Sequence, residues 1–167
     1  MIDNSAITGM ACDRKSQTLA VGNSNGYVII FECDNQSEWK PIHNIKPKDE
    51  IPVTSLDVLN RSENLYIVGF ANGEVKIISP KGQVLVEMSA HSRGINALTC
   101  HPSKPLFATC SDDTFLNIFE VKESLDIGLV LSSRVNDYQL VGVAFGGDSV
   151  ISSPYDFKNL AVWNHVV

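Results

Sequence analysis

The stretch that decides the fold runs from Ser89 to Lys122 and reads SAHSRGINALTCHPSKPLFATCSDDTFLNIFEVK. It contains three short apolar runs that are separated by segments rich in Ser, Pro and Asp. Runs of this length, bounded by such residues, are typical of β-strands. Asp112 and Asp113 lie between the second and third runs, where acidic residues tolerate the left-handed backbone of a hairpin turn. The stretch therefore predicts three consecutive antiparallel strands.

The same spacing recurs in four segments of the chain. Each segment opens with three apolar residues at positions i, i+3 and i+5, namely Ile7, Met10 and Cys12; Val53, Leu56 and Val58; Ile95, Leu98 and Cys100; and Leu140, Val143 and Phe145. In each segment, a second apolar run contains a small residue and a third run ends near a large apolar one. These pairs of small and large residues are Gly22 and Phe31, Gly69 and Ile78, Cys110 and Phe119, and Ser153 and Trp163. The step from small to large is nine residues in the first three segments and ten in the fourth. Four matches in series indicate an internal repeat.

A fourth apolar run follows in three of the four segments. It reads WKPIHNI at 39–45, QVLVEM at 83–88 and GLVLSS at 128–133. A repeat of roughly 40–45 residues that contains four short antiparallel strands is typical of a β-propeller blade. We therefore expect an all-β partial propeller over 1–167. Its blades would cover about 6–46, 53–90, 95–134 and 140–167, and the last would lack its fourth strand.

The opening stretch also resembles a WD repeat. It has a His in the loop before its first strand, the element Cys-His-Pro, an Asp turn, and an aromatic residue near the end of its third strand. In typical WD repeats the loop His, a second-strand Ser or Thr, the turn Asp and a third-strand Trp form a hydrogen-bonded relay. The resemblance places His91, Thr109 and Asp113 in such a relay. The fourth position is Phe119, whose ring has no N–H to donate, and Asp112 is expected to be a solvated turn residue.

The resemblance to the WD-repeat family covers about residues 6–167, although only this third unit matches well by itself. Within the family, 68–98 and 111–121 are similar to the C-terminal half of one member. That group is not known for enzymes, so the resemblance implies a non-enzymatic scaffold for protein–protein interaction.

Composition and charge narrow the expected partners to other proteins. The net charge is −6 and the thirteen Lys and Arg residues are scattered, whereas a nucleic-acid partner requires a basic stripe. No apolar run approaches the ~20 residues of a membrane helix, so no membrane partner is expected. The four cysteines form no C-x-x-C motif, which predicts reduced thiols in a cytoplasmic protein without a metal site. No cofactor is expected, because the glycine-rich turns lack the Lys-Ser/Thr of a phosphate loop.

One alternative function stays open, namely a hydrolase or a small-ligand-binding propeller that uses the central channel. His91, Ser111 and Asp113 are the residue types of a hydrolase triad, but no G-x-S-x-G elbow is present. For the scaffold, three residues are candidates for partner binding: Arg93 in the loop before a first strand, Tyr155 beside a turn, and Trp39 at the start of a fourth strand.

An open row of blades leaves two apolar blade faces without a neighbour. Three arrangements would cover them. The N-terminal residues MIDNS could supply a missing strand, two copies could form one ring, or the chain could be part of a longer protein. The homodimer ranks first, through the open blade faces and the free edge at Leu160 to Val167.

Overall fold

The computed structural model describes residues 5–13 and 15–166, and this part of the chain contains strands and no helix. Four antiparallel sheets follow one another along the chain. Blade 1 consists of β1 (Ile7–Asp13), β2 (Thr18–Asn23), β3 (Val28–Cys33) and β4 (Trp39–Ile45). Blade 2 consists of β5 (Val53–Leu59), β6 (Leu65–Phe70), β7 (Glu74–Ile78) and β8 (Val84–Ser89).

Blade 3 consists of β9 (Ile95–Cys100), β10 (Leu106–Ser111), β11 (Phe115–Val121) and β12 (Ile127–Arg134). Blade 4 contains three strands in the described residues, β13 (Leu140–Gly146), β14 (Ser149–Pro154) and β15 (Ala161–Trp163). The prediction of an all-β chain of propeller blades, with a three-stranded fourth blade, is therefore confirmed. The proposed N-terminal closing strand falls mainly on residues 1–4, which lie outside the described residues.

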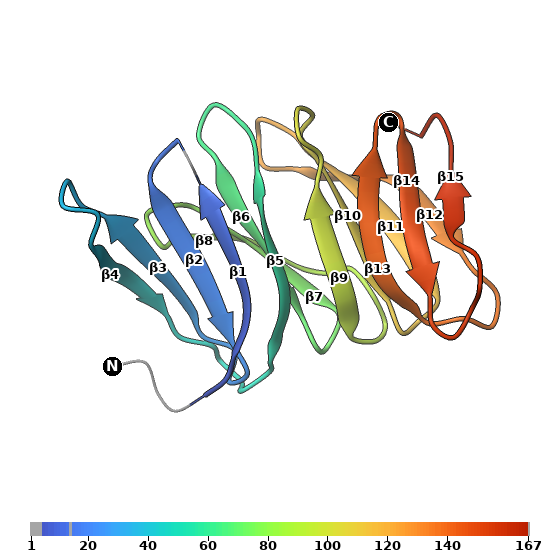
Figure 1. Ribbon diagram of the computed structural model, residues 1–167, viewed down its shortest axis with the longest axis horizontal. Coiled ribbons are helices and arrows are strands. Elements are labelled where there is room, and N and C mark those ends of the chain that lie inside the picture. Colours follow the sequence, from blue (N-terminus) through green and yellow to red (C-terminus); the bar gives the residue numbers. More distant parts are fainter. Residues whose placement is uncertain (1–4, 14, 167) are drawn as a thin grey trace.

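The blades stand side by side in an arc (Figure 1). The first strands of neighbouring blades contact one another, β1 with β5, β5 with β9 and β9 with β13, and they form the inner side of the arc. Within each sheet the strands keep their sequence order, so the fourth strands β4, β8 and β12 lie at the outer rim. We call the side of a blade that faces the preceding blade its leading face, and the side toward the next blade its trailing face.

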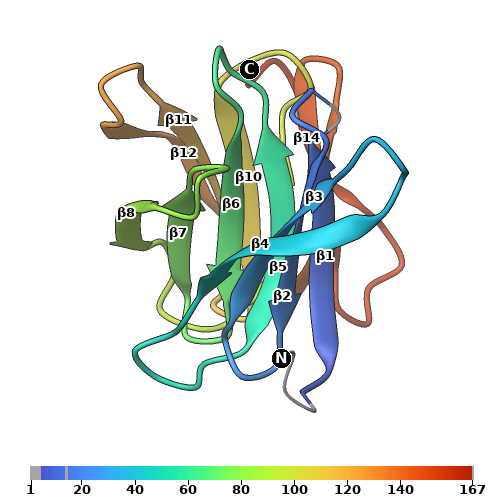
Figure 2. The same ribbon diagram turned by 90° about the vertical axis from the view of Figure 1, so that its left-hand side faces the viewer.

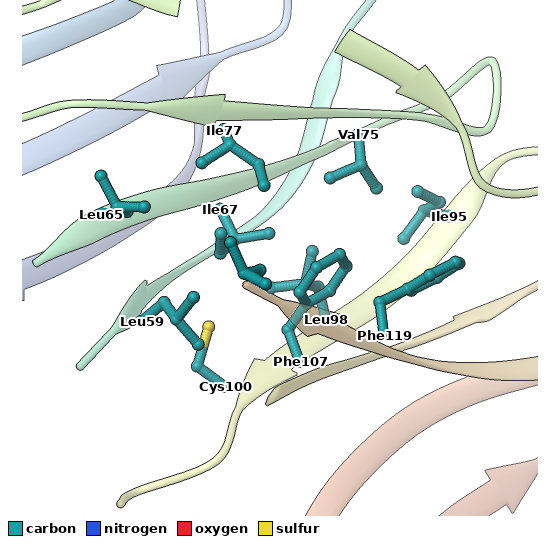
Figure 3. Close-up of a cluster of buried hydrophobic side chains, with 11 residues drawn as sticks. Leu59, Leu65, Ile67, Val75, Ile77, Ile95, Leu98, Cys100, Phe107 and Phe119 are labelled. Atoms are coloured by element: carbon teal, nitrogen blue, oxygen red, sulfur yellow. The ribbon is translucent and has the colours of Figure 1, made fainter. Parts of the chain in front are cut away.

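Three apolar clusters form the core, and each lies between two neighbouring blades. In the cluster between blades 2 and 3, Ile67 and Ile77 of the trailing face meet Leu98 and Phe119 of the next leading face (Figure 3). Phe119 also stacks on Phe107, with ring centroids 5.1 Å apart. Because each inner blade is covered on both sides, its second strand is buried throughout and does not alternate between buried and exposed residues.

The repeated sequence pattern has a packing explanation. The apolar triads of β5, β9 and β13 lie in the clusters that join each blade to the preceding one, so they belong to leading faces. The small residues of the second strands in blades 1 and 2 make room for the next blade. A Cβ atom on Gly22 would come within 2.4 Å of Val53, and one on Gly69 within 3.1 Å of Ile95.

Candidate functional site

The predicted relay residues lie together at one end of blade 3. His91 is in the β8–β9 loop, Thr109 is on β10, and Asp113 is in the β10–β11 turn. The His91 Nδ1 atom is 3.0 Å from both carboxylate oxygens of Asp113, and its Nε2 atom is 2.9 Å from the Thr109 hydroxyl. With Asp113 ionised, Nδ1 carries the proton and donates, and Nε2 accepts the proton of the hydroxyl. The three side chains therefore form one continuous hydrogen-bonded chain.

Asp113 also organises the backbone around it. Its carboxylate accepts hydrogen bonds from the backbone N–H of Ser92 and of Phe115, both at 3.0 Å. The β8–β9 loop is further held on blade 2, because the Gly73 carbonyl accepts the backbone N–H of His91 at 3.1 Å. The relay thus joins a turn of blade 2, a loop and a turn of blade 3.

Burial sets the protonation state of His91, whereas hydrogen bonds and the nearby imidazole set that of Asp113. Burial lowers the pKa of His91, and this outweighs the raising effect of the neighbouring Asp113 charge and hydrogen bond. For Asp113, burial raises the pKa, but the Phe115 N–H, the nearby His91 and the Ser92 N–H together lower it below its usual value. The folded state therefore favours a neutral imidazole bound to an ionised carboxylate.

The relay ends at Thr109. Phe119, which occupies the tryptophan position of typical repeats, lies on the leading face and stacks on Phe107. The neighbouring Asn117 donates to the Ala90 carbonyl at 2.9 Å and so adds a second tie between β11 and the β8–β9 loop. Its side-chain oxygen is buried and has no hydrogen-bond partner among the described residues.

Asp112 corrects one expectation, because it is more than a solvated turn residue. Its carboxylate accepts a hydrogen bond from Asn96 Nδ2 at 2.6 Å, and the same Asn96 amide donates to the Leu140 carbonyl of blade 4 at 2.9 Å. The two adjacent aspartates therefore make different contacts. Asp113 binds the β8–β9 loop that precedes blade 3. Asp112 positions the Asn96 side-chain amide, which donates to blade 4.

Polar contacts between blades were not predicted from the sequence. Asp57 of β5 accepts the backbone N–H of Cys100 at 2.7 Å, across the interface of blades 2 and 3. Asn64 donates to Asp13 at 2.8 Å, across the interface of blades 1 and 2. No motif marks these residues, because each partner comes from a different repeat and is more than forty residues away.

A second inter-blade contact between blades 1 and 2 buries a phenol. The Tyr66 hydroxyl and the Thr18 hydroxyl are 2.6 Å apart. Burial raises the pKa of Tyr66 to about 12, although the Thr18 hydrogen bond lowers it in part. The phenol is therefore neutral over the physiological range and serves as a packed polar tie.

The triad of a hydrolase is not assembled. The Ser111 hydroxyl donates to the Arg93 carbonyl at 3.3 Å and accepts the Asp113 N–H at 3.1 Å, so its partners are backbone groups. His91 instead has Thr109 on its second nitrogen and is buried. No group of three or more potential metal ligands occurs in residues 5–13 and 15–166. Across the same residues, no helix has the length and apolar character required to cross a membrane.

The three candidate residues for partner binding lie at two different ends of the blades. Arg93 is exposed in the β8–β9 loop, and Tyr155, 63% exposed, is in the β14–β15 turn. These two segments lie at the same end, where fourth-to-first-strand loops meet second-to-third-strand turns, as in the Tyr155 N–H bond to the Gln139 carbonyl. Trp39 begins β4 after the β3–β4 turn, which lies at the opposite end of the blade.

The chain is similar to known repeat proteins in sequence and in fold. The family described as "WD domain, G-beta repeat" matches residues 82–120. WD repeat-containing protein 54 of Mus musculus is 25% identical over 107 residues, which cover 59% of this chain and 32% of that protein. It is the family member that residues 68–98 and 111–121 resemble. WD repeat-containing protein 74 of Homo sapiens is 32% identical over 96 residues, 56% of this chain and 25% of that protein.

A solved structure shows the same arrangement of strands. The crystal structure of Saccharomyces cerevisiae Sqt1 superposes with a TM-score of 0.82 at 12% sequence identity, over 97% of this chain and 46% of that one. The chain thus spans a quarter to a third of the length of the curated relatives named above and about half of this structural neighbour.

Proposed function

Because residues 82–120 match the WD-repeat family model and the chain has the β-propeller fold, we propose that it is a non-enzymatic scaffold for protein–protein interaction. The observation that carries the proposal is that the His91 and Asp113 side chains are engaged in structural hydrogen bonds. Both are occupied by hydrogen bonds that hold loops and turns together, and the imidazole is buried away from solvent. A fold alone does not establish a function, but here the residue types that would perform chemistry instead stabilise the blade.

Exposed side chains at one end of the arc support a partner-binding surface there. Arg93 and Tyr155 are exposed, and Phe157, in the same turn as Tyr155, is 44% exposed with its ring 4.6 Å from that of Tyr138. Arg and Tyr are enriched among the residues that dominate binding energy in protein interfaces. We therefore place the partner at the loop-and-turn end of blades 3 and 4, and we expect a protein partner in preference to nucleic acid or membrane, in keeping with the net charge of −6.

Affinity capture with matched variants tests this surface. Arg93→Glu and Tyr155→Ala are expected to lose bound proteins that the unchanged chain retains, while their melting temperatures stay the same because both side chains are exposed. Trp39→Ala tests the third candidate, an exposed aromatic residue at the opposite end of a blade, and full recovery of partners by this variant would assign binding to the end that carries Arg93 and Tyr155. Equal recovery of the same partners by all variants would exclude the Arg93–Tyr155 surface.

The alternative, a hydrolase or ligand-binding propeller, makes the opposite prediction for His91. If His91 is structural, His91→Ala lowers the melting temperature, and a panel of ester, peptide and phosphate substrates shows no turnover by the unchanged chain. Turnover that His91→Ala abolishes without loss of stability would favour the enzyme instead.

The proposal of a cytoplasmic location rests on the thiols. All four cysteines are free, and Cys100 and Cys110 are buried. Burial raises the pKa of the Cys110 thiol to about 12 and that of Cys100 well above its usual value, so both are unreactive packing residues. Free thiols of this kind are typical of reducing compartments.

A further inference from the structure

The leading face of blade 1 carries apolar triad positions whose equivalents in the other blades are buried or half-buried. Its triad residues Ile7 and Met10 are 55% and 60% exposed. The equivalent residues of blade 2, Val53 and Leu56, are 1% and 9% exposed, because they pack on blade 1. Ile95 and Leu98 in blade 3 and Leu140 in blade 4 are likewise buried. Figure 2 looks onto blade 1 from this side, and no other sheet lies in front of it.

The trailing face of blade 4 shows the complementary feature. Strand pairing places Ala144, Ile151 and Val162 in one row across this sheet, as it places Asp57, Ile67 and Ile77 in blade 2. Ile77 is fully buried against blade 3, whereas Val162 is 51% exposed. The edge expected at Leu160 to Val167 is part of the same open end. Leu160 is exposed, and Val167 lies outside the described residues.

These two faces are a matched pair. At all three internal interfaces a trailing face of this type meets a leading face of this type, and each contact is a core cluster. We propose that a second copy of this chain docks head to tail, with its blade 4 on the first copy's blade 1 and its blade 1 on the first copy's blade 4. Two such contacts related by a two-fold axis close a ring.

The share of a larger propeller chain that the arc matches supports this occupant. The arc superposes on 46% of the Sqt1 chain with a TM-score of 0.82. Two such arcs would therefore span about the length of that larger chain. Large exposed apolar patches on soluble proteins generally mark interfaces, and this proposal is independent of the surface at Arg93 and Tyr155.

An engineered cross-link tests the geometry of the contact. At the interface of blades 2 and 3, Cys100 contacts Asp57, with its N–H 2.7 Å from the carboxylate. The equivalents of these positions at the two open ends are Cys12, which is exposed, and Ala144. Ala144→Cys should therefore form a disulfide with Cys12 of the second copy under mild oxidation. Ala144→Cys combined with Cys12→Ser, and Leu129→Cys on the exposed outer strand of blade 3, should not cross-link.

The native mass tests the proposal without cross-linking. The unchanged chain at micromolar concentration should have twice the mass of one chain. Met10→Glu and Val162→Glu should each halve this mass while circular dichroism stays that of a β protein. Leu129→Glu, with the same 60% exposure as Met10 but no place on an open face, should leave the mass unchanged.

Three results would overturn the proposal. The first is a monomeric mass for the unchanged chain. The second is a mass that responds to Met10→Glu but not to Val162→Glu, since two leading faces would then pair with each other. The third is a ladder of higher multimers from oxidised Ala144→Cys, which indicates an open filament instead of a closed ring.

Discussion

At the scale of single residues, the two adjacent aspartates in the β10–β11 turn have separate structural tasks. Asp113 accepts hydrogen bonds from the His91 imidazole, the Ser92 N–H and the Phe115 N–H. Asp112 accepts one from Asn96, which also reaches blade 4. An ionised acceptor that serves several donors contributes more than a neutral one, because each bond is charge-assisted.

Replacement of Asp113 should therefore be costly. Asp113→Ala is expected to lower the free energy of unfolding by about 2–4 kcal/mol, since it leaves a buried imidazole N–H and two backbone N–H groups without their acceptor. Urea unfolding followed by circular dichroism measures the change. Asp49→Ala, at an exposed loop position, is the control and should fall within about 0.5 kcal/mol of the unchanged chain. An equal loss in both variants would mean that the relay does not stabilise the blade.

The lowered pKa of His91 predicts how stability depends on pH. The unfolded chain takes up a proton at His91 near its usual pKa of 6.5, whereas the folded chain resists it, mainly because of burial. Stability is therefore fully present above pH 6.5 and is lost as the pH falls toward the folded-state value. His101, whose pKa burial and Lys104 also lower, adds to the same trend.

Melting temperatures between pH 7.5 and pH 5 test this prediction. The unchanged chain should lose stability over that range, and His91→Gln should lose less, because glutamine does not titrate. His91→Gln combined with His101→Gln should be the least sensitive of the three. The same pH slope in all three proteins would assign the acid sensitivity to other groups.

At the scale of elements, the small residue Gly22 in the second strand of blade 1 is required by the next blade. Gly22 lies so close to β5 that an added Cβ would meet the side chain of Val53 at 2.4 Å. Gly9 in the neighbouring strand faces Leu56 at 3.7 Å, an ordinary contact distance. The two glycines of blade 1 thus differ in the space that the next blade leaves them.

This difference gives a matched pair of substitutions. Gly22→Ala is expected to cost about 1–3 kcal/mol through overpacking, and Gly9→Ala should change the free energy of unfolding by no more than about 0.5 kcal/mol. Gly22→Ala combined with Val53→Ala should cost less than the sum of the two single changes, because the smaller residue at 53 restores the space. Strict additivity in a denaturant double-mutant cycle would show that the two residues do not compete for space.

At the scale of the whole molecule, the stability of the arc depends on what covers its two open faces. If two copies form one ring, unfolding also separates them, and the melting temperature depends on protein concentration. A tenfold increase in concentration should raise it by about 2 °C, given an unfolding entropy of about 2 cal/mol/K per residue over both chains.

The variants of the open faces supply the control for this prediction. Met10→Glu should remove the concentration dependence and lower the melting temperature at every concentration, whereas Leu129→Glu should keep the dependence. Differential scanning calorimetry over two decades of concentration distinguishes these cases. A melting temperature of the unchanged chain that is independent of concentration would contradict the dimeric ring.

The sequence by itself determined the fold and most of the relay, since both depend on local spacing. Runs of apolar residues at fixed steps, with Asn-Gly or Asp turns between them, specify antiparallel strands within one repeat. His91, Thr109 and Asp113 lie within 23 residues and are brought together by that single repeat. Only the tertiary structure decided the contacts between repeats, such as Asp57 with Cys100 and Asn96 with Leu140. These contacts depend on how one sheet is seated on the next, and strand periodicity specifies which residues face a neighbour but not which residues of the neighbour they meet.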